Sequence, residues 1–330
     1  MKPVRWGIIG VARHFIRGVL IPMQHSEFVE LHGIASRDPA KARAAAEKYG
    51  IPRYYQSYDD LLRDPTIEAV YIPLPNHMHL EWIRKSAEAG KHIVCEKPLT
   101  MNAAEAAEAA DYAERCGVLL MEAFMYRFHP QWRRAHELVM SGHIGDVRAV
   151  QTFFSYDNTD PENIRNRLDT GGGAILDIGC YAVSVSRFMF DSEPKRIVSM
   201  ANRDPRFKTD ILCSALLDFG DGHAVFTVGT QTFPFQTVDV IGSAGRIHID
   251  IPFNIYPDVP VVVTVTTSIG TRELSAGPAD HYRIQFEHFS EAIRENRPSP
   301  IPSTDAVKNM RVLDAFFRSE RSGEWETIET

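Results

Sequence analysis

The chain has 330 residues, of which 44% are hydrophobic and 24% charged, and a formal net charge of -7 at pH 7. This length is more than one compact core usually holds, so it favours a globular protein of two domains. Acidic and basic residues are interspersed, which argues against nucleic acid or an anionic membrane surface as the main partner and favours a small molecule.

The beginning of the chain and its cysteines predict the compartment. Residues 1–5 lead into an apolar run that is too short for a signal peptide or a membrane span, so we expect a cytoplasmic protein. The cysteines lie far apart without a Cys-x-x-Cys pair, which favours reduced thiols over disulfides or zinc. They are Cys95, Cys116, Cys180 and Cys213. We therefore expect no bound metal.

Residues 4–9 have the apolar pattern of a buried parallel strand, and a turn and a helical pattern follow, as at the start of a dinucleotide-binding fold. Gly10 stands where that turn needs a glycine, whereas Ala12 and Phe15 replace the second and third glycines of the usual fingerprint. The pattern predicts that Gly10, Ala12 and Arg13 contact the cofactor. A chance glycine in an ordinary strand, loop and helix is the alternative.

Strands and helices alternate after this unit. A capping box of Asn102 and Glu105 marks the start of one helix. Apolar runs predict further strands at residues 29–35, 69–72, 92–95 and 118–122, with helices at residues 39–49 and 77–89 and short elements up to residue 62. Six parallel strands fit a doubly wound Rossmann sheet.

The end of the second strand indicates which dinucleotide binds. An acidic side chain there accepts hydrogen bonds from the adenosine ribose, whereas a basic one suits a 2′-phosphate. The sequence reads Ser36-Arg37-Asp38, a hydroxyl followed by a guanidinium, with Lys41 one helical turn later. This predicts NADP rather than NAD. Asp38 keeps NAD open, because its carboxylate could take the acidic role.

Lys97 follows the strand at residues 92–95, at the sheet edge where ligands of parallel sheets collect. Pro98 comes next and holds the lysine in an extended turn. We expect Glu96 and Lys97 to contact the cofactor. A solvated Glu–Lys pair in a surface loop is the alternative.

The loop after residue 72 is rich in proline and ends at the same edge of the sheet. It is predicted to lie along the cofactor and to contact it through Pro73, Leu74, Asn76 and His77. His77 and His79 form either half of a metal site or ordinary loop hydrogen bonds.

The second half of the sequence changes its periodicity. A helical pattern at residues 130–141 is followed by an alternating strand at residues 147–157. Helices at residues 161–167, 174–190, 280–296 and 303–321 are predicted to cover one face of a large, mainly antiparallel sheet. Its later strands are predicted at residues 196–200, 211–219, 224–232, 237–241, 246–251 and 261–267. The other face lacks cover, which predicts a homodimer joined sheet to sheet.

Gly171, Gly172 and Gly173 lead into a helix that carries Asp177 and Tyr181 on one face. The glycines allow close approach of the backbone to another group. An acid and a phenol on one face favour a functional site, whereas a buried hydrogen-bonded pair with a purely structural role is the alternative.

Together these segments resemble the Gfo/Idh/MocA family, named after glucose-fructose oxidoreductase, inositol dehydrogenase and a rhizopine-catabolism protein. The resemblance covers essentially the whole chain. It depends on the glycine turn, Glu96-Lys97-Pro98, the run Glu122-Ala-Phe-Met-Tyr-Arg-Phe-His-Pro130 and residues 171–181. The sequence is most similar to the branch of glucose-fructose oxidoreductase, NADP-dependent xylose dehydrogenase and the dimeric dihydrodiol dehydrogenases.

The expected fold class is α/β, with a Rossmann domain at residues 1–123 and an α+β domain with a large open sheet at residues 124–330. The helix at residues 303–321 is an element that could pack back on the first domain. The resemblance implies a dimer or a tetramer. It also implies a catalytic lysine, aspartate and tyrosine at Lys97, Asp177 and Tyr181.

The resulting hypothesis is an NADP-dependent dehydrogenase that moves hydride between nicotinamide and a sugar hydroxyl, such as the anomeric hydroxyl of xylose or glucose. Tyr181 acts as the acid/base with help from Lys97, and Asp177 binds a substrate hydroxyl or orients Lys97. Arg127 and His129 line the sugar pocket or pin the domain junction. The alternatives are a trans-dihydrodiol dehydrogenase with the same residues and a non-catalytic regulator that senses NADP.

Overall fold

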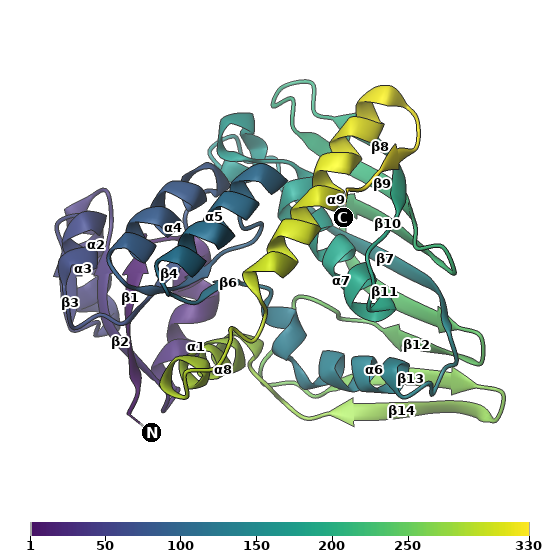
Figure 1. Ribbon diagram of the computed structural model, residues 1–330, viewed down its shortest axis with the longest axis horizontal. Helices are drawn as coiled ribbons and strands as arrows, with labels where there is room; N and C mark the ends of the chain where they lie inside the picture. The colour runs from purple at the N-terminus through teal and green to yellow at the C-terminus, as the bar shows by residue number, and fades with distance from the viewer. Residues whose placement is uncertain (1, 330) are drawn as a thin grey trace. The chain divides into compact units, whose positions relative to one another are not determined.

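The computed structural model describes residues 2–329, which form two compact units (Figure 1). The first unit contains the residues up to Met125 and the returning segment Tyr282–Val307, and the second contains Tyr126–His281 and the residues from Lys308 onward. The sequence predicted a single boundary between residues 123 and 124, which would assign this returning segment to the second domain. The structure instead places it in the first unit.

The first unit is built on a parallel sheet with the strand order β3-β2-β1-β4-β5-β6. Its strands are β1 (Val4–Ile9), β2 (Val29–Ala35), β3 (Arg53–Tyr55), β4 (Ala69–Ile72), β5 (His92–Cys95) and β6 (Leu120–Glu122). All residues of β4 are buried, as expected for a strand covered on both faces. The order reverses between β1 and β4, and this reversal defines the crevice where such sheets bind ligands.

The helices between these strands begin close to the predicted positions. They are α1 (Leu20–Gln24), α2 (Pro39–Tyr49), α3 (Tyr58–Arg63), α4 (His79–Glu88) and α5 (Ala103–Arg115). The Asn102 side chain accepts the Glu105 N–H at 2.9 Å, which confirms the predicted cap of α5. Helix α4 begins later than residue 77, because Asn76–Met78 form a separate 3₁₀ turn. A π-helical turn, Phe15–Val19, precedes α1.

Helix α8 (His281–Arg294) corrects one prediction. Its apolar stripe was expected to cover the antiparallel sheet, but the Phe286 ring lies 5.1 Å from Trp6 of β1 and 5.2 Å from Tyr71 of β4, measured between ring centroids. Trp6 also donates to Ser290 at 3.2 Å. The stripe predicted a buried helix correctly, but periodicity alone does not say which sheet a helix meets.

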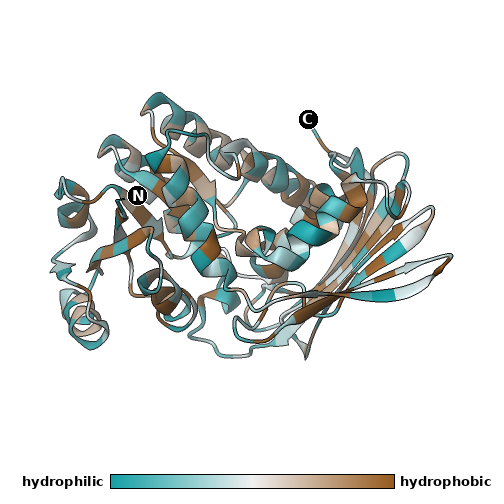
Figure 2. Ribbon diagram, turned by 90° about the horizontal axis from the view of Figure 1, so that it is seen from below, coloured by the Kyte–Doolittle hydropathy of each residue, from teal (hydrophilic) through white to brown (hydrophobic). Residues whose placement is uncertain are grey.

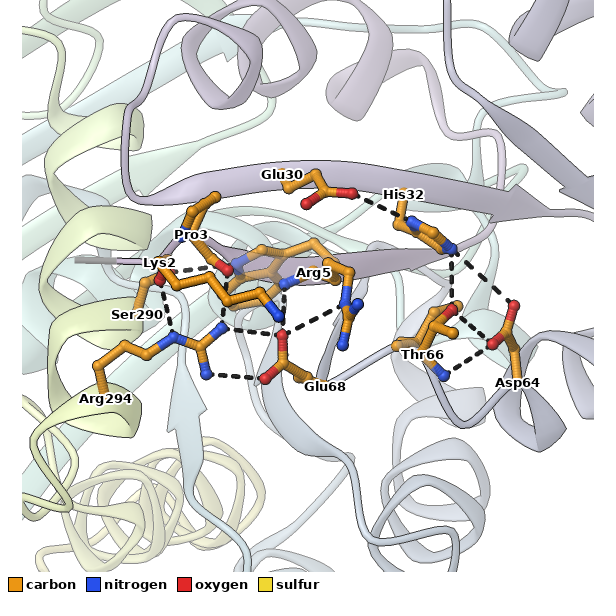
Figure 3. Close-up of polar contacts among 12 residues, drawn as sticks. Lys2, Pro3, Arg5, Glu30, His32, Asp64, Thr66, Glu68, Ser290 and Arg294 are labelled. Carbon is orange, nitrogen blue, oxygen red and sulfur yellow. Dashed lines mark hydrogen bonds and ion pairs between the residues drawn. The ribbon is translucent and has the colours of Figure 1, made fainter.

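Arg294 holds the end of α8 against the amino-terminal end of the parallel sheet (Figure 3). Its guanidinium donates to the Lys2 and Pro3 carbonyls at 2.8 and 2.7 Å and to both Glu68 carboxylate oxygens at 2.7 and 2.8 Å. The hydrogen bonds from Arg294 to the Glu68 carboxylate lower the pKa of Glu68, whereas burial acts in the opposite direction. The returning segment is therefore tied to the first unit by a charged group as well as by its apolar face.

The second unit is built on a nine-stranded sheet with the order β14-β13-β12-β11-β7-β10-β9-β8-β15. All neighbouring strands are antiparallel except β7 and β10. The strands are β7 (Val147–Asp157), β8 (Arg196–Arg203), β9 (Asp210–Asp218), β10 (His223–Gly229), β11 (Gln231–Gly242), β12 (Gly245–Ile249), β13 (Val261–Thr267), β14 (Gly270–Ala276) and β15 (Glu326–Thr327). The sequence did not predict β14, because its residues are largely exposed and polar.

One face of this sheet is covered by α6 (Pro130–Met140), α7 (Cys180–Phe190) and the later part of α9 (Ser303–Ser322), and Figure 2 shows helices on one side of the strand layer. Ser199 of β8 donates its N–H to Ser319 Oγ at 3.0 Å, so α9 lies on this sheet and only its first residues, up to Val307, belong to the first unit. Most of this helix therefore belongs to the second unit, and its expected packing on the first domain stays a prediction.

The predicted helix at residues 161–167 is also wrong. The segment forms two short 3₁₀ turns, Ile164–Asn166 and Leu168–Thr170. Asn163 accepts the Arg165 N–H at 3.1 Å, and Thr170 Oγ1 donates to the Ile164 carbonyl at 2.6 Å. Such local side-chain hydrogen bonds compete with those of a helix.

The helical stretch Leu168–Phe190 has the length and hydropathy of a membrane span, but 83% of its most apolar window is buried inside the structure. That burial is the arrangement of a core helix. The apolar residues of α7 are thus used for packing in the second unit.

Candidate functional site

The turn after β1 provides an open stretch of backbone at the crevice of the parallel sheet. Gly10 has φ of 125°, and a Cβ there would lie 2.9 Å from Leu74 Cδ2. Only glycine adopts this conformation without strain. Ala12 and Arg13 follow and are at least partly exposed before the π-helical turn begins. The backbone geometry fits the close approach of a pyrophosphate.

The structure shows different surroundings for the residues at the end of β2 that were predicted to favour NADP and for Asp38, which kept NAD open. Asp38 caps α2, because its side chain accepts the Ala40 N–H at 3.0 Å, and its own N–H donates to Ser36 Oγ at 3.2 Å. Arg37 and Lys41 are exposed beside it. The Asp38 carboxylate thus serves the helix, while a hydroxyl and two cations remain at the position that faces the adenosine ribose in such folds.

Two predicted loops meet through His79 of α4. The ring Nε2 lies 2.8 Å from the Leu74 carbonyl, and Nδ1 lies 3.0 Å from the Pro98 carbonyl. The ring is buried, which lowers the pKa of His79. This confirms the loop hydrogen-bonding interpretation for His79, and the described residues contain no group of three metal-ligating side chains. His79 therefore connects the loop of Pro73 and Leu74 with the segment that follows Lys97.

The predicted contacts of Asn76 and His77 with a cofactor stay predictions. Both residues lie on the 3₁₀ turn after the loop, at the carboxyl end of β4, and both are partly exposed. Asn76 and His77 therefore lie at the carboxyl edge of the parallel sheet, as predicted.

Glu96 and Lys97 lie at the carboxyl end of β5. One Glu96 oxygen accepts the Tyr71 hydroxyl at 2.5 Å and lies 3.6 Å from His14 Nε2. Burial and the carboxylate raise the pKa of Tyr71, so its phenol remains a donor. Sequence reasoning missed Tyr71, because it occupies an ordinary apolar position of β4. Glu96 is thus fixed directly beside Lys97.

In the second unit, Asp177 lies on a π-helical turn, Ile175–Gly179, that leads into α7. Such turns are frequent at functional sites. One Asp177 oxygen, Oδ2, accepts the Tyr156 hydroxyl at 2.6 Å and Arg165 Nε at 2.9 Å. Burial and the nearby carboxylate raise the pKa of Tyr156. Sequence reasoning missed both partners, which come from β7 and from the 3₁₀ turn at Ile164–Asn166.

The glycines before this turn are packed against the chain itself. A Cβ on Gly172 would lie 2.5 Å from the Arg165 carbonyl oxygen, and one on Gly173 would lie 2.1 Å from Asp210 Oδ1. The other Asp210 oxygen accepts the Ile175 N–H at 2.7 Å. The close approach predicted for these glycines is therefore made by the loop backbone and by a carboxylate that caps the turn.

Tyr181, in the first turn of α7, is packed among other aromatic side chains of the second unit. Its ring centroid lies 5.0 Å from Phe253 and 5.9 Å from both Phe154 and Tyr126. Only 5% of the residue is exposed. The Tyr181 ring is thus fixed by packing at the start of α7, directly after the π-helical turn that carries Asp177.

Arg127 and His129 precede α6. The Arg127 guanidinium lies 4.6 Å from the Phe188 ring centroid. His129 caps α6 by accepting the Gln131 N–H at Nδ1, at 3.2 Å, and burial lowers its pKa to about 4, so the ring is neutral near pH 7. The structure gives both side chains packing roles in the second unit, and their contacts with a substrate stay predictions.

The fold and the residues at the crevice of the first unit define a class of protein, that of dinucleotide-binding proteins. Parallel sheets with a glycine turn at the strand-order reversal and a hydroxyl–guanidinium pair after the second strand bind phosphorylated dinucleotides. The second unit carries an acid, Asp177, and a phenol, Tyr181, near the start of α7, and their proton-transfer roles stay predictions.

Comparisons with known proteins agree with this class. Residues 4–124 match the model of the "Oxidoreductase family, NAD-binding Rossmann fold", and residues 132–248 match the GFO/IDH/MocA C-terminal domain. The chain belongs to this family. The resemblance in the sequence is thereby confirmed, and so is the predicted pair of sheets.

Several relatives match the chain over most of its length. It is 43% identical to an uncharacterised oxidoreductase of Rhizobium meliloti over 99% of this chain and all of that one, and 38% identical to D-xylose 1-dehydrogenase (NADP(+)) 2 of Haloferax volcanii over 96% and 98%. It is 32% identical to mouse trans-1,2-dihydrobenzene-1,2-diol dehydrogenase over 74% of each chain.

Two solved structures are similar throughout. The 3-ketoreductase of Actinomadura kijaniata, in complex with NADP and TDP-benzene, has a TM-score of 0.90 at 28% identity and covers 96% of this chain and 98% of its own. The aldose-aldose oxidoreductase of Caulobacter crescentus, in complex with glycerol, has a TM-score of 0.91 at 26% identity and covers 99% and 100%.

Proposed function

We propose that this protein is an NADP-dependent dehydrogenase that transfers hydride between a sugar hydroxyl and nicotinamide, with the anomeric carbon of an aldopyranose such as xylose or glucose as the reacting centre. The observation that carries the proposal is the similarity to the xylose dehydrogenase, which extends over nearly the whole of both chains. Lys97, Asp177 and Tyr181 are all present in the chain.

NADP is the cofactor in this proposal. Gly10, Ala12 and Arg13 would hold the pyrophosphate, and Ser36, Arg37 and Lys41 would hold the 2′-phosphate. The capping role of Asp38 supports this choice over NAD, because its carboxylate is engaged by the Ala40 N–H. When bound, the nicotinamide supplies the hydride acceptor or donor.

Tyr181 is proposed as the group that takes the hydroxyl proton. A free tyrosine titrates near 10, so work near pH 7 requires a shift of about three units, or about 4 kcal/mol. An ammonium group about 4 Å away is worth about 4 kcal/mol at an effective dielectric near 20. Lys97 is proposed to supply that charge. The proposal therefore requires both residues to act on one substrate.

Variants of the ketoreductase support this pairing. That protein has been crystallised with a lysine replaced and with a tyrosine replaced, and the two positions are as far apart along its chain as Lys97 and Tyr181 are here. Asp177 is proposed to accept a hydrogen bond from a substrate hydroxyl or to orient Lys97.

An activity panel tests the proposal. The purified protein is incubated with NADP or NAD and with aldoses, polyols and diols, and the absorbance of the reduced cofactor is followed. We expect turnover with NADP and an aldopyranose. Binding of NADP without turnover of any substrate would contradict the proposal and favour the regulator.

A trans-dihydrodiol dehydrogenase is the second candidate. The three aromatic rings around Tyr181 favour it, since an apolar ring substrate prefers aromatic neighbours, and the mouse enzyme is a relative. Faster turnover of a trans-dihydrodiol than of any aldose in the same panel would select this candidate.

We also propose a homodimer formed through the open face of the second sheet, with a tetramer as the alternative assembly. Met200, Val225 and Phe235 are 66%, 44% and 53% exposed. The strand pairing places them on one face, across β8, β10 and β11. Figure 2 shows strands without a helix on that side. Exposed apolar side chains on an uncovered sheet face are typical of interfaces between copies.

Light scattering tests the assembly. We expect a particle of at least twice the chain mass and a shift toward the monomer for Val225→Lys. Ile269→Lys is the control, because Ile269 is 97% exposed in the turn between β13 and β14. A wild-type particle of 37.2 kDa at micromolar concentration would contradict the dimer.

A cytoplasmic location is part of the proposal. The four cysteines are present as free thiols, and Cys95, Cys180 and Cys213 are buried. Reduced thiols are usual in that compartment. Fractionation of cells that express the protein would test it, and recovery outside the cytoplasm would contradict it.

A further inference from the structure

We propose that Arg165 and Tyr156 are positioning residues for Asp177, which together keep its carboxylate ionised and in one orientation while the substrate is bound. The inference deepens the proposed function, because that function assigns Asp177 to the substrate or to Lys97. It also rests on contacts within the second unit alone.

The geometry of the three side chains is the first argument. Tyr156 Oη and Arg165 Nε lie 2.6 and 2.9 Å from the same carboxylate oxygen, Asp177 Oδ2. They approach it from β7 and from the 3₁₀ turn Ile164–Asn166. Hydrogen bonds to an ionised acceptor are among the strongest in proteins. Two donors from separate elements hold this carboxylate oxygen in one place.

The electrostatic balance is the second argument. The Asp177 side chain is 11% exposed, and burial disfavours the charged form of a carboxyl group. The Arg165 guanidinium offsets this cost as an ion pair. Asp210 also raises the pKa of Tyr156, because its negative charge opposes ionisation of the phenol. The Asp210 carboxylate itself accepts the Ile175 N–H at 2.7 Å. The raised pKa of Tyr156 keeps its phenol protonated, so it donates at any working pH.

The loop that carries Arg165 is held without the ion pair. Asn166 donates to the Asp160 carbonyl at 2.8 Å, and Thr170 donates to the Ile164 carbonyl at 2.6 Å. The close contact of Gly172 with the Arg165 carbonyl adds to this packing. A substitution at the end of the Arg165 side chain should therefore leave the loop in place.

The same loop offers a matched control. Arg167 is two residues later, is exposed, and forms an ion pair with Asp169 at 2.7 Å. Arg167→Gln removes the same charge from the same loop without touching Asp177. A difference between Arg165→Gln and Arg167→Gln thus reports the contact with Asp177 and not the loss of one positive charge.

The test compares the pH dependence of kcat/KM for the wild type, Arg165→Gln, Tyr156→Phe and Arg167→Gln, with NADP and the best sugar of the panel. We expect the acid limb to move upward by about one pH unit or more in Arg165→Gln and by less in Tyr156→Phe. Arg167→Gln should reproduce the wild-type profile. A wild-type acid limb in Arg165→Gln would overturn the inference.

A second measurement does not depend on turnover. Carbon-13 spectra of protein labelled in its aspartate carboxyl groups follow the titration of Asp177, with Asp177→Asn as the assignment control. We expect the Asp177 signal to titrate at higher pH in Arg165→Gln than in the wild type. An unchanged titration would overturn the inference even if sugars are oxidised. A failed panel with a shifted titration would overturn only the proposed function.

Discussion

A glycine turn followed by a π-helical turn occurs in both units, and the two copies serve different purposes. After β1, the atom nearest to a Cβ on Gly10 would be Cδ2, at the end of the flexible Leu74 side chain, 2.9 Å away. Before α7, Gly172 and Gly173 face a carbonyl oxygen and a carboxylate of the chain itself. The first turn is predicted to contact the cofactor, whereas the second is filled by the chain itself. Glycine in a sequence therefore predicts close approach without saying what approaches.

The largest effect is expected for Gly173→Ala. Gly173 has φ of 121°, where an alanine is strained by about 1–3 kcal/mol, and its Cβ would lie 2.1 Å from Asp210 Oδ1. Displacing that carboxylate also breaks its hydrogen bond to the Ile175 N–H. We expect a loss of about 4 kcal/mol in the free energy of unfolding, measured by urea denaturation.

Gly50→Ala is the control for that substitution. Gly50 caps α2 with φ of 66° and has no atom within 4 Å of its would-be Cβ, so the cost should be about 1 kcal/mol. Equal losses for the two variants would mean that the turn before α7 is not filled as described.

Most strand positions could be predicted from the sequence, because each strand is a local pattern, whereas the order of the strands in the two sheets came from the structure. Buried runs such as Val4–Ile9 and Ala69–Ile72 have the predicted bounds, since continuous apolar character is typical of a parallel sheet covered on both faces. The candidate residues after β1, β2 and β5 also followed from strand ends alone. The contact of α8 with β1 could not be predicted, because a helical stripe is the same whichever sheet it meets.

Arg294→Met is expected to have the next largest effect, since Arg294 is a charged tie between α8 and the parallel sheet. It donates to two carbonyls and to both oxygens of Glu68, and the two side chains are only 18% and 27% exposed. We expect a loss of about 2 kcal/mol at pH 7 in urea denaturation. Arg297→Met is the control, because its ion pair with Glu295 is exposed and is worth about 0.5 kcal/mol or less.

The pH dependence of the same variant has a definite sign. Arg294 lowers the pKa of Glu68 in the folded state, so this stabilisation is present above the unfolded pKa of about 4.3 and is lost as the pH falls below it. The stability of Arg294→Met should therefore fall less steeply than that of the wild type between about pH 5 and pH 3. Parallel curves would contradict the role given to this ion pair.

The partners of Asp177 show a second limit of sequence reasoning. Asp177 and Tyr181 stand out because they are four residues apart on one helix, but Tyr156 and Arg165 reach Asp177 from 21 and 12 residues away. Tyr156 lies in an alternating strand and Arg165 in a stretch with the pattern of a helix. No spacing in the sequence marks a hydrogen bond between such elements.

A smaller effect is expected for Arg37→Ala. The guanidinium is the charge at the end of β2 that would recognise the 2′-phosphate of NADP. We expect the ratio of kcat/KM for NADP to that for NAD to fall about tenfold or more, which corresponds to about 1.4 kcal/mol. Arg43→Ala is the control on the outer part of α2, where Arg43 pairs with Glu47. An unchanged ratio in Arg37→Ala would place the phosphate elsewhere.

The central claim is that Lys97 and Tyr181 work as one proton-transfer unit on a sugar. The most direct measurement is turnover with NADP and the preferred aldose for Lys97→Met, Tyr181→Phe and the double variant. Each single variant should lose about a hundredfold or more in kcat, and the double variant little further, because loss of either group disables the unit. Binding of NADP should survive Tyr181→Phe. Near-normal turnover in Tyr181→Phe would contradict the account and make His129 the first residue to test.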